Sequence, residues 1–412
     1  MKRMIMVGLG ALSLLGCEER KLHLCDIATS DCQESIYYAG VRIRGDGYDP
    51  FAGIPPIRTI GEEQFRDELQ AEADQAAKDP ASQQPWWNSA LALLHLMPSA
   101  AEVEQDAIDN QVEQVAAYYD PSTRKVTVID HQKAQTDSTR LGNMITLAHE
   151  LVHAIQDREL DLDIHPQTTD ELFANKAIIE GDATVHEFLF ALDLEPRIKQ
   201  VYPDPLSYVK TLRAMFMADG PKLEDGSDGV NFATLGPPAM AAMYLVYPLG
   251  GIWVGEHHKR GGNSAVRHAY GKSPKRSIEY LLPFGTVAPP VTTSTCTPHF
   301  PTNQDFVARG KDTLGAVMLY GYLMGWGVKS AEAEVTASLW RKDAMFVAYN
   351  PNTQKTAVAW RIELAQPVSA ETLAYITTAD GPRVVQEGST LLITASDDAD
   401  VAANWKPSAS CP

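Results

Sequence analysis

The residues His149-Glu150-Leu151-Val152-His153 form an HExxH pattern, the feature of this chain best suited to chemistry. Residues four apart in a helix lie one turn apart on the same face, so both imidazoles can bind one metal ion. Glu150 lies about 100° round the helix axis from His149, where it can take a proton from a water molecule at an open metal position. The pattern therefore predicts a metal site with His149 and His153 as ligands and Glu150 as general base.

A catalytic zinc ion usually has three protein ligands and one open position, so a third ligand is needed. The residue six positions beyond His153 is Glu159 rather than His, which excludes the HExxHxxGxxH arrangement of metzincins. We therefore expect a carboxylate from the following helix. Glu180 is preferred, because the small residues in Ile179-Glu180-Gly181-Asp182-Ala183 allow another helix to come close. Glu187, two turns further along the same face, is the alternative.

Two segments resemble a known class of enzymes. The sequences TLAHELVHAIQDR at 146–158 and IIEGDAT at 178–184 resemble bacterial zinc metallopeptidases of the gluzincin type. They are most similar to a largely uncharacterised bacterial group in which an AHELTHALQDQ-like helix is followed by an EGDA helix. The similarity extends from AAYYDPSTRKVTV through YPLGG to WRKD at 340–343, about two thirds of the chain. The resemblance implies one Zn²⁺ bound by His149, His153 and Glu180, with Glu150 as general base.

The resemblance leaves two functional questions open. The segment Leu281-Leu282-Pro283 stands where Leu-His-Pro is expected, which puts substrate handling in question, whereas the departures at Ile155 and Arg158 are mild. Hydrolysis of an amide also needs a donor that stabilises the developing oxyanion. The sequence does not choose among the candidates His186, Tyr247, His257, His258, His268 and Tyr270.

The elements that must position these side chains are visible in the sequence pattern. Apolar residues recur every three or four positions across 138–160, which predicts a helix that contains the HExxH pattern. Thr168-Thr169-Asp170-Glu171 is a capping-box start for a second helix, which reaches about residue 192 and carries Glu180. Before both, 112–130 is predicted as a β-hairpin with a type I turn at Asp120-Pro121. This hairpin either aligns an extended peptide by strand addition or is purely structural.

The whole pattern predicts a mainly helical α+β protein with a zincin-like metallopeptidase domain at 51–290. A Pro/Thr-rich stretch at 287–302 separates this domain from a smaller α+β region at 304–412. In that region a helical stretch at 313–335 precedes strand-like runs. These runs lie at 345–350, 356–364 and 383–396, the last of them a hairpin.

The first residues predict export and lipid attachment. Lys2 and Arg3 precede an apolar run of 13 residues, which is too short to cross a membrane and is typical of a signal peptide at residues 1–16. Leu14-Leu15-Gly16-Cys17 resembles the bacterial lipobox, which implies acylation of Cys17. We expect 17–50 to be a lipidated tether that holds the protein at a membrane of the bacterial cell envelope, facing the periplasm or the cell surface.

The cysteine content and the charge narrow the environment and the partners. Apart from Cys17 the cysteines are Cys25, Cys32, Cys296 and Cys411, an even set suited to an oxidising compartment. Of three possible pairings we favour the local one, Cys25 with Cys32 and Cys296 with Cys411. The formal net charge of −18 repels phosphate backbones, so nucleic-acid binding is not expected.

These observations predict a membrane-anchored, zinc-dependent metallopeptidase that acts on peptide or protein substrates. Two alternatives stay open. One is a non-catalytic, zinc-containing envelope lipoprotein that acts as a binding module, which would be favoured if Glu150 proved dispensable. The other is a zinc amidase that acts on cell-wall peptides.

Overall fold

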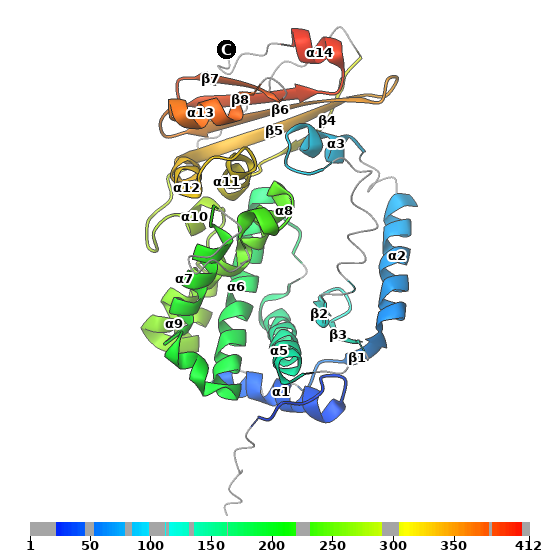
Figure 1. Ribbon diagram of the computed structural model, residues 1–412, viewed down its shortest axis with the longest axis vertical. Coiled ribbons are helices and arrows are strands. Elements are labelled where there is room, and N and C mark those ends of the chain that lie inside the picture. The colour runs from blue at the N-terminus through cyan, green and yellow to red at the C-terminus, as the bar shows by residue number, and fades with distance from the viewer. Residues whose placement is uncertain are drawn as a thin grey trace, which may run out of the picture.

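The computed structural model describes residues 22–45, 53–78, 85–98, 112, 115–131, 136–162, 164–219, 231–290, 305–378 and 381–405. Within these residues the protein is a mainly helical α+β structure with a three-stranded and a five-stranded sheet (Figure 1). The predicted fold class is confirmed. The expected signal peptide, the expected lipid site at Cys17 and the expected pair of Cys296 and Cys411 lie outside the described residues.

The first described segment is part of the folded domain. Helix α1 (Ser30–Arg44) buries Ile36 and Tyr37 in an apolar cluster shared with α5 (Asp137–Leu160). A disulfide joins Cys25 to Cys32, as expected for the local pairing. Residues 30–44, which lie within the expected tether at 17–50, therefore form a helix packed against α5. The segment is polar overall, but its few apolar side chains lie on one face and pack against α5.

The predicted hairpin is present, but its first strand begins at Ala117, whereas residue 112 at its predicted start is helical; a third strand also joins the sheet. Strands β2 (Ala117–Asp120) and β3 (Lys125–Asp130) are antiparallel, and the Asp120 carboxylate accepts hydrogen bonds from the backbone N–H and the hydroxyl of Ser122 in the turn. Strand β1 (Ile57–Gly61) pairs in parallel with β3 and leads into α2 (Glu62–Lys78). The strand order β1-β3-β2 leaves β2 at the edge of the sheet.

Helix α6 (Thr169–Leu194) is the centre of the helical body. Its N-terminus is capped as predicted, because the Thr168 hydroxyl accepts a hydrogen bond from the Glu171 N–H. It packs against α5 and against α9 (Val246–Tyr270). The crossing with α9 has no room for a side chain: a Cβ on Gly181 would lie 2.1 Å from the carbonyl carbon of Gly250. The backbones of α6 and α9 are therefore in direct contact.

Shorter helices surround this pair. They are the 3₁₀ turns η2 (Pro196–Gln200) and η3 (Phe232–Thr234) and the α-helices α7 (Pro205–Phe216), α8 (Pro238–Tyr244) and α10 (Ile278–Leu281). The continuous stretch Pro238–Tyr270 is long and apolar enough to cross a membrane, but 61% of its most apolar window is buried inside the protein. It therefore serves as core helix in this fold.

The C-terminal region is an antiparallel sheet with helices against it. Its strand order is β4-β5-β6-β8-β7, which places the two longest strands in the interior. The strands are β4 (Val307–Asp312), β5 (Trp340–Asn350), β6 (Lys355–Leu364), β7 (Arg383–Glu387) and β8 (Thr390–Ser396). The helices are α11 (Ala316–Gly325), α12 (Ser330–Ser338), α13 (Ala370–Ile376) and α14 (Ala399–Asn404). The helical stretch expected at 313–335 is thus two helices, interrupted near Gly327, whose φ is +79°.

The sheet and the helical body share one core. A single buried apolar cluster includes Ala177 of α6, Leu249 of α9, Leu319 of α11 and Trp360 of β6. It therefore contains residues from both sides of the expected boundary at 287–302. Helix α3 (Pro85–Leu93) lies against this sheet (Figure 1).

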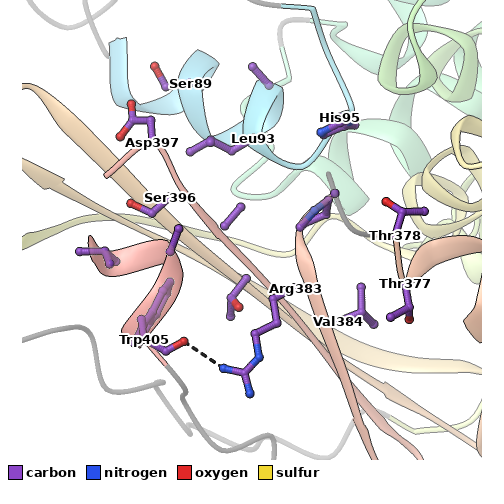
Figure 2. Close-up of a pocket in the computed structure, with 17 residues that line it drawn as sticks. Ser89, Leu93, His95, Thr377, Thr378, Arg383, Val384, Ser396, Asp397 and Trp405 are labelled. Carbon is purple, nitrogen blue, oxygen red and sulfur yellow. Dashed lines mark hydrogen bonds between the residues drawn. The ribbon is translucent and has the colours of Figure 1, made fainter. Parts of the chain in front are cut away.

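An open pocket of about 750 Å³ lies between the end of α3 and the far strands of the C-terminal sheet (Figure 2). Arg383 spans one side of it and donates a hydrogen bond to the carbonyl of Trp405 at 3.0 Å. No residue of the HExxH group is among the described residues that line it.

Candidate metal centre

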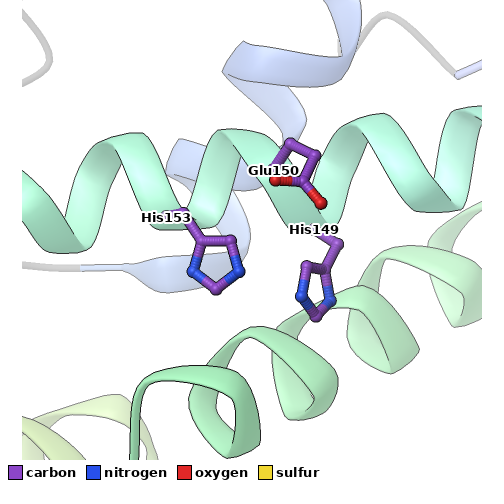
Figure 3. A group of neighbouring side chains, drawn as sticks. All are labelled: His149, Glu150 and His153. Carbon is purple, nitrogen blue, oxygen red and sulfur yellow. The ribbon is translucent and has the colours of Figure 1, made fainter. Parts of the chain in front are cut away.

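Helix α5 presents the HExxH residues as the sequence predicts. Figure 3 shows His149 and His153 side by side on one helix, with their rings pointing in the same direction. Their ring centroids are 4.7 Å apart, and each residue is only 8% exposed. One ligand atom from each of His149, Glu150 and His153 can be chosen such that all lie within 4.8 Å of one another. This buried group could hold a metal ion.

A carboxylate from α6 faces both imidazoles. The Oε2 atom of Glu180 lies 3.2 Å from Nε2 of His149 and 3.3 Å from Nε2 of His153. Two nitrogen donors and one oxygen donor therefore converge on the same small volume. Burial by itself would raise the pKa of the Glu180 carboxyl. Attraction to His153 and His149 outweighs burial and keeps that pKa well below its usual value.

Glu187, the alternative third ligand, occupies the opposite side of the His149 ring. Its Oε2 atom lies 2.6 Å from Nδ1 of His149. A carboxylate accepts hydrogen bonds, so Nδ1 of His149 donates to Glu187, while Nε2 of the same ring lies on the side of Glu180. The structure thus brings Glu180 to the converging nitrogens and gives Glu187 a different position, which orients the ring.

His153 is oriented by an amide. Its Nδ1 atom lies 2.8 Å from Oε1 of Gln156, while Nε2 of Gln156 donates to the Ile179 carbonyl at 2.9 Å and to Oδ2 of Asp182 at 2.8 Å. Because the Gln156 nitrogen must face these two acceptors, its oxygen faces His153. The Nδ1 atom of His153 therefore carries the proton and donates it to that oxygen. Both histidines therefore direct Nε2 toward Glu180, while Nδ1 is engaged by an acceptor. Gln156 is not among the site residues predicted from the sequence, although it lies one turn beyond His153.

Asp182 is held in turn by the N-terminal helix. Nη1 of Arg44 lies 2.7 Å from Oδ2 of Asp182, and both side chains are buried. The hydroxyl of Tyr270 also donates to Asp182, and His186 lies beside it. Burial by itself would raise the pKa of Asp182, but the Arg44 guanidinium keeps it well below its usual value. Arg44 was missed because a single Arg in a polar segment carries no signal of burial.

Glu150 is anchored to the edge strand. Its Oε2 atom accepts a hydrogen bond from the backbone N–H of Tyr119 on β2 at 2.8 Å. The hydroxyl of Tyr119 donates to Oδ2 of Asp157, at 2.6 Å, so the same residue ties β2 to α5 twice. Burial raises the pKa of Glu150, and the two imidazoles oppose that rise. Tyr119 was not among the predicted site residues.

Of the six candidates for an oxyanion donor, Tyr247 lies at the centre. Its ring centroid is 6.0 Å from that of His149, and burial, with Glu180 and Glu150 nearby, raises the pKa of its hydroxyl. His186 and Tyr270 belong to the Asp182 network instead, and His257 packs on Trp253. Leu282, the residue in the place of an expected His, packs against the main apolar cluster.

Comparisons of the chain with protein-family models, with curated proteins and with solved structures found no match.

Proposed function

We propose that this protein is a zinc-dependent metallopeptidase of gluzincin type, anchored in a bacterial cell envelope by a lipid on Cys17. The observation that carries the proposal is the convergence of Nε2 of His149, Nε2 of His153 and Oε2 of Glu180, with each Nδ1 already engaged by an acceptor. Two imidazoles and a carboxylate are a known ligand set of catalytic zinc, which leaves one position open.

Zinc would supply Lewis acidity, which activates water and polarises a carbonyl. The protein's own groups complete the chemistry. Glu150 is placed beside the donors to take a proton from the attacking water and pass it to the leaving amine. The Tyr119 N–H holds one oxygen of that carboxylate in position. The Tyr247 hydroxyl, neutral because its pKa is raised, can donate to the developing oxyanion.

Two further features support a peptide as the substrate and the envelope as the location. Strand β2 is at the edge of its sheet and contacts Glu150, so an extended peptide that adds to this edge would pass the general base. The disulfide between Cys25 and Cys32 is typical of an oxidising compartment and agrees with the lipobox-like sequence before it.

The decisive experiment compares purified wild type with Glu150→Gln. Both proteins are loaded with zinc, their metal content is measured, and cleavage of a mixed peptide library is followed by mass spectrometry. Glutamine can still accept from the Tyr119 N–H, so we expect one zinc per chain in both proteins and turnover reduced by about 10²–10⁴-fold in the variant. Glu256→Gln, which alters a surface ion pair with Lys210, is the matched control and should cleave like wild type. Equal cleavage by wild type and Glu150→Gln would refute the mechanism, and absence of zinc from both would refute the site.

A further inference from the structure

A cavity of about 540 Å³ adjoins the candidate metal centre, and Glu180 and Tyr247 line both. Its size is in the range of pockets that hold small ligands or several side-chain groups. The cavity lies between α6, α3, α8 and α11, so the helical body and the helix before the C-terminal sheet both contribute to it. Nothing in the chemistry described so far requires this space.

The lining of the cavity is mainly apolar and rich in methionine. Met97, Met240, Met243 and Met318 contribute to it, and other large apolar or aromatic side chains complete it. These others are Trp87, Leu91, Leu172, Tyr244, Val246 and Leu314. Methionine is unbranched and flexible, so a surface built from it adapts to apolar groups of different shape. The cavity therefore fits a class of large apolar side chains better than one particular residue.

One positive charge stands at this cavity. Lys176 is the one basic residue among the described lining residues, and it precedes Glu180 by one helical turn, on the same face of α6. The residue is exposed and, within the described part of the chain, has no carboxylate at ion-pair distance. In a protein with a net charge of −18, a cation that has no carboxylate partner among the described residues and lies beside an apolar cavity favours a ligand that carries a carboxylate.

We infer that this cavity is the specificity pocket of the proposed peptidase: it takes the large apolar side chain of a residue next to the scissile bond, while Lys176 pairs with a carboxylate of the same peptide. The inference rests on the proposed function. The carboxylate is either the peptide's C-terminus or the side chain of a nearby Asp or Glu.

The first part of the test is a set of quenched fluorescent peptides that share one sequence and differ at the residue on either side of the scissile bond. Replacing Leu with Ala at the position that enters the cavity should lower kcat/KM roughly 50-fold, because each of three buried carbons contributes about a factor of four. Met and Phe should perform within about tenfold of Leu. Two further pairs of peptides identify the source of the carboxylate. One pair ends in a free acid or an amide, and the other carries Asp or Asn near the scissile bond.

The second part uses variants of the lining. Met243→Trp fills the cavity and should remove the preference for Leu over Ala, whereas Met215→Trp on α7, outside the cavity, should keep it. Met240→Trp, at a position 41% exposed, repeats the test if Met243→Trp does not fold. Lys176→Glu should remove the advantage of the carboxylate peptides, and Lys272→Glu, an exposed lysine elsewhere, should not.

Binding of the same peptides to Glu150→Gln, followed by fluorescence anisotropy, separates this inference from the proposed function. If wild type cleaves peptides but the profile is flat and Met243→Trp changes nothing, the pocket assignment is wrong and the peptidase stands. If nothing is cleaved but apolar peptides bind and Met243→Trp abolishes binding, the pocket stands and the peptidase is wrong. If a fatty-acid probe binds tightly and none of the peptides competes with it, the assignment of the cavity to a peptide side chain is wrong.

Discussion

The contact between α6 and α9 provides the sharpest test of how the centre is held together. In Gly181→Ala the new Cβ would lie 2.1 Å from the carbonyl carbon of Gly250 and 2.4 Å from the nitrogen of Gly251. Carbon atoms pack at about 3.5–4.0 Å, so the helices must separate by about 1.5 Å. Both neighbours are backbone atoms, which cannot rotate away. Overpacking of this kind costs about 1–3 kcal/mol of stability, and Ala gains about 1 kcal/mol over Gly in helix propensity. Because both clashing neighbours are backbone atoms, we expect the upper end of that range and therefore a net loss of about 2 kcal/mol in the free energy of unfolding.

The same displacement acts on Glu180, the residue before Gly181. A metal site tolerates about 0.5 Å of error, so a shift of about 1.5 Å should weaken zinc binding at least tenfold. Urea unfolding measures the stability, and competition with a chromophoric chelator measures the zinc affinity. The control is Gly142→Ala on α5, where a Cβ meets nothing within 4 Å and should add about 1 kcal/mol. If Gly181→Ala gains stability like the control and binds zinc like wild type, the claim that this crossing positions Glu180 is wrong.

Three further predictions address other parts of the centre and its support. Gln156→Leu leaves Nδ1 of His153 without an acceptor, so the zinc affinity should fall about 10–100-fold in the chelator assay, and an unchanged affinity would contradict the orienting role. Tyr247→Phe should lower kcat about 10–10³-fold while zinc content and KM stay near wild type; loss of zinc instead would point to a structural role. Burial raises the pKa of Asp170 from 3.8 to about 7, so the folded protein retains a proton that the unfolded chain releases, and stability should fall as the pH rises from about 4 to about 7. Asp170→Asn, which can still accept from Ser277, should flatten this decline by up to about 4 kcal/mol in denaturant unfolding measured across that range, and parallel profiles would show that Asp170 is not the group responsible.

The parts of this structure that depend on local pattern could be predicted from the sequence. Helices α5 and α6, the β2–β3 hairpin and the C-terminal strands each show their own periodicity or turn chemistry. The small residues around Glu180 favoured it over Glu187, but the final position of either carboxylate could not be derived from the sequence, because both lie on one face of α6. It depends on how α6 is placed against α5 and α9, which is decided at Gly181 and Gly250 by a contact between distant parts of the chain.

Two other features could not be predicted from local sequence patterns, because they too depend on distant parts of the chain. Strand β1 has no strong alternation of its own and is stabilised by pairing with β3. Helix α1 lies in a polar segment and depends on partners far along the chain: Arg44 and Asp182 are 138 positions apart. Patterns within ten or twenty residues cannot reveal such pairings.

Helix α1 determines where the chain can be cleaved without disturbing the metal centre. Arg44 balances the buried charge of Asp182, which holds Gln156 and through it His153. A chain that begins after residue 45 would lose the guanidinium that compensates this buried charge, at a cost of up to about 3–5 kcal/mol. A chain that begins at residue 22 would keep the whole support. Cleavage before α1 would therefore separate a protein with an intact metal centre from the proposed anchor at Cys17, whereas loss of α1 would weaken that centre.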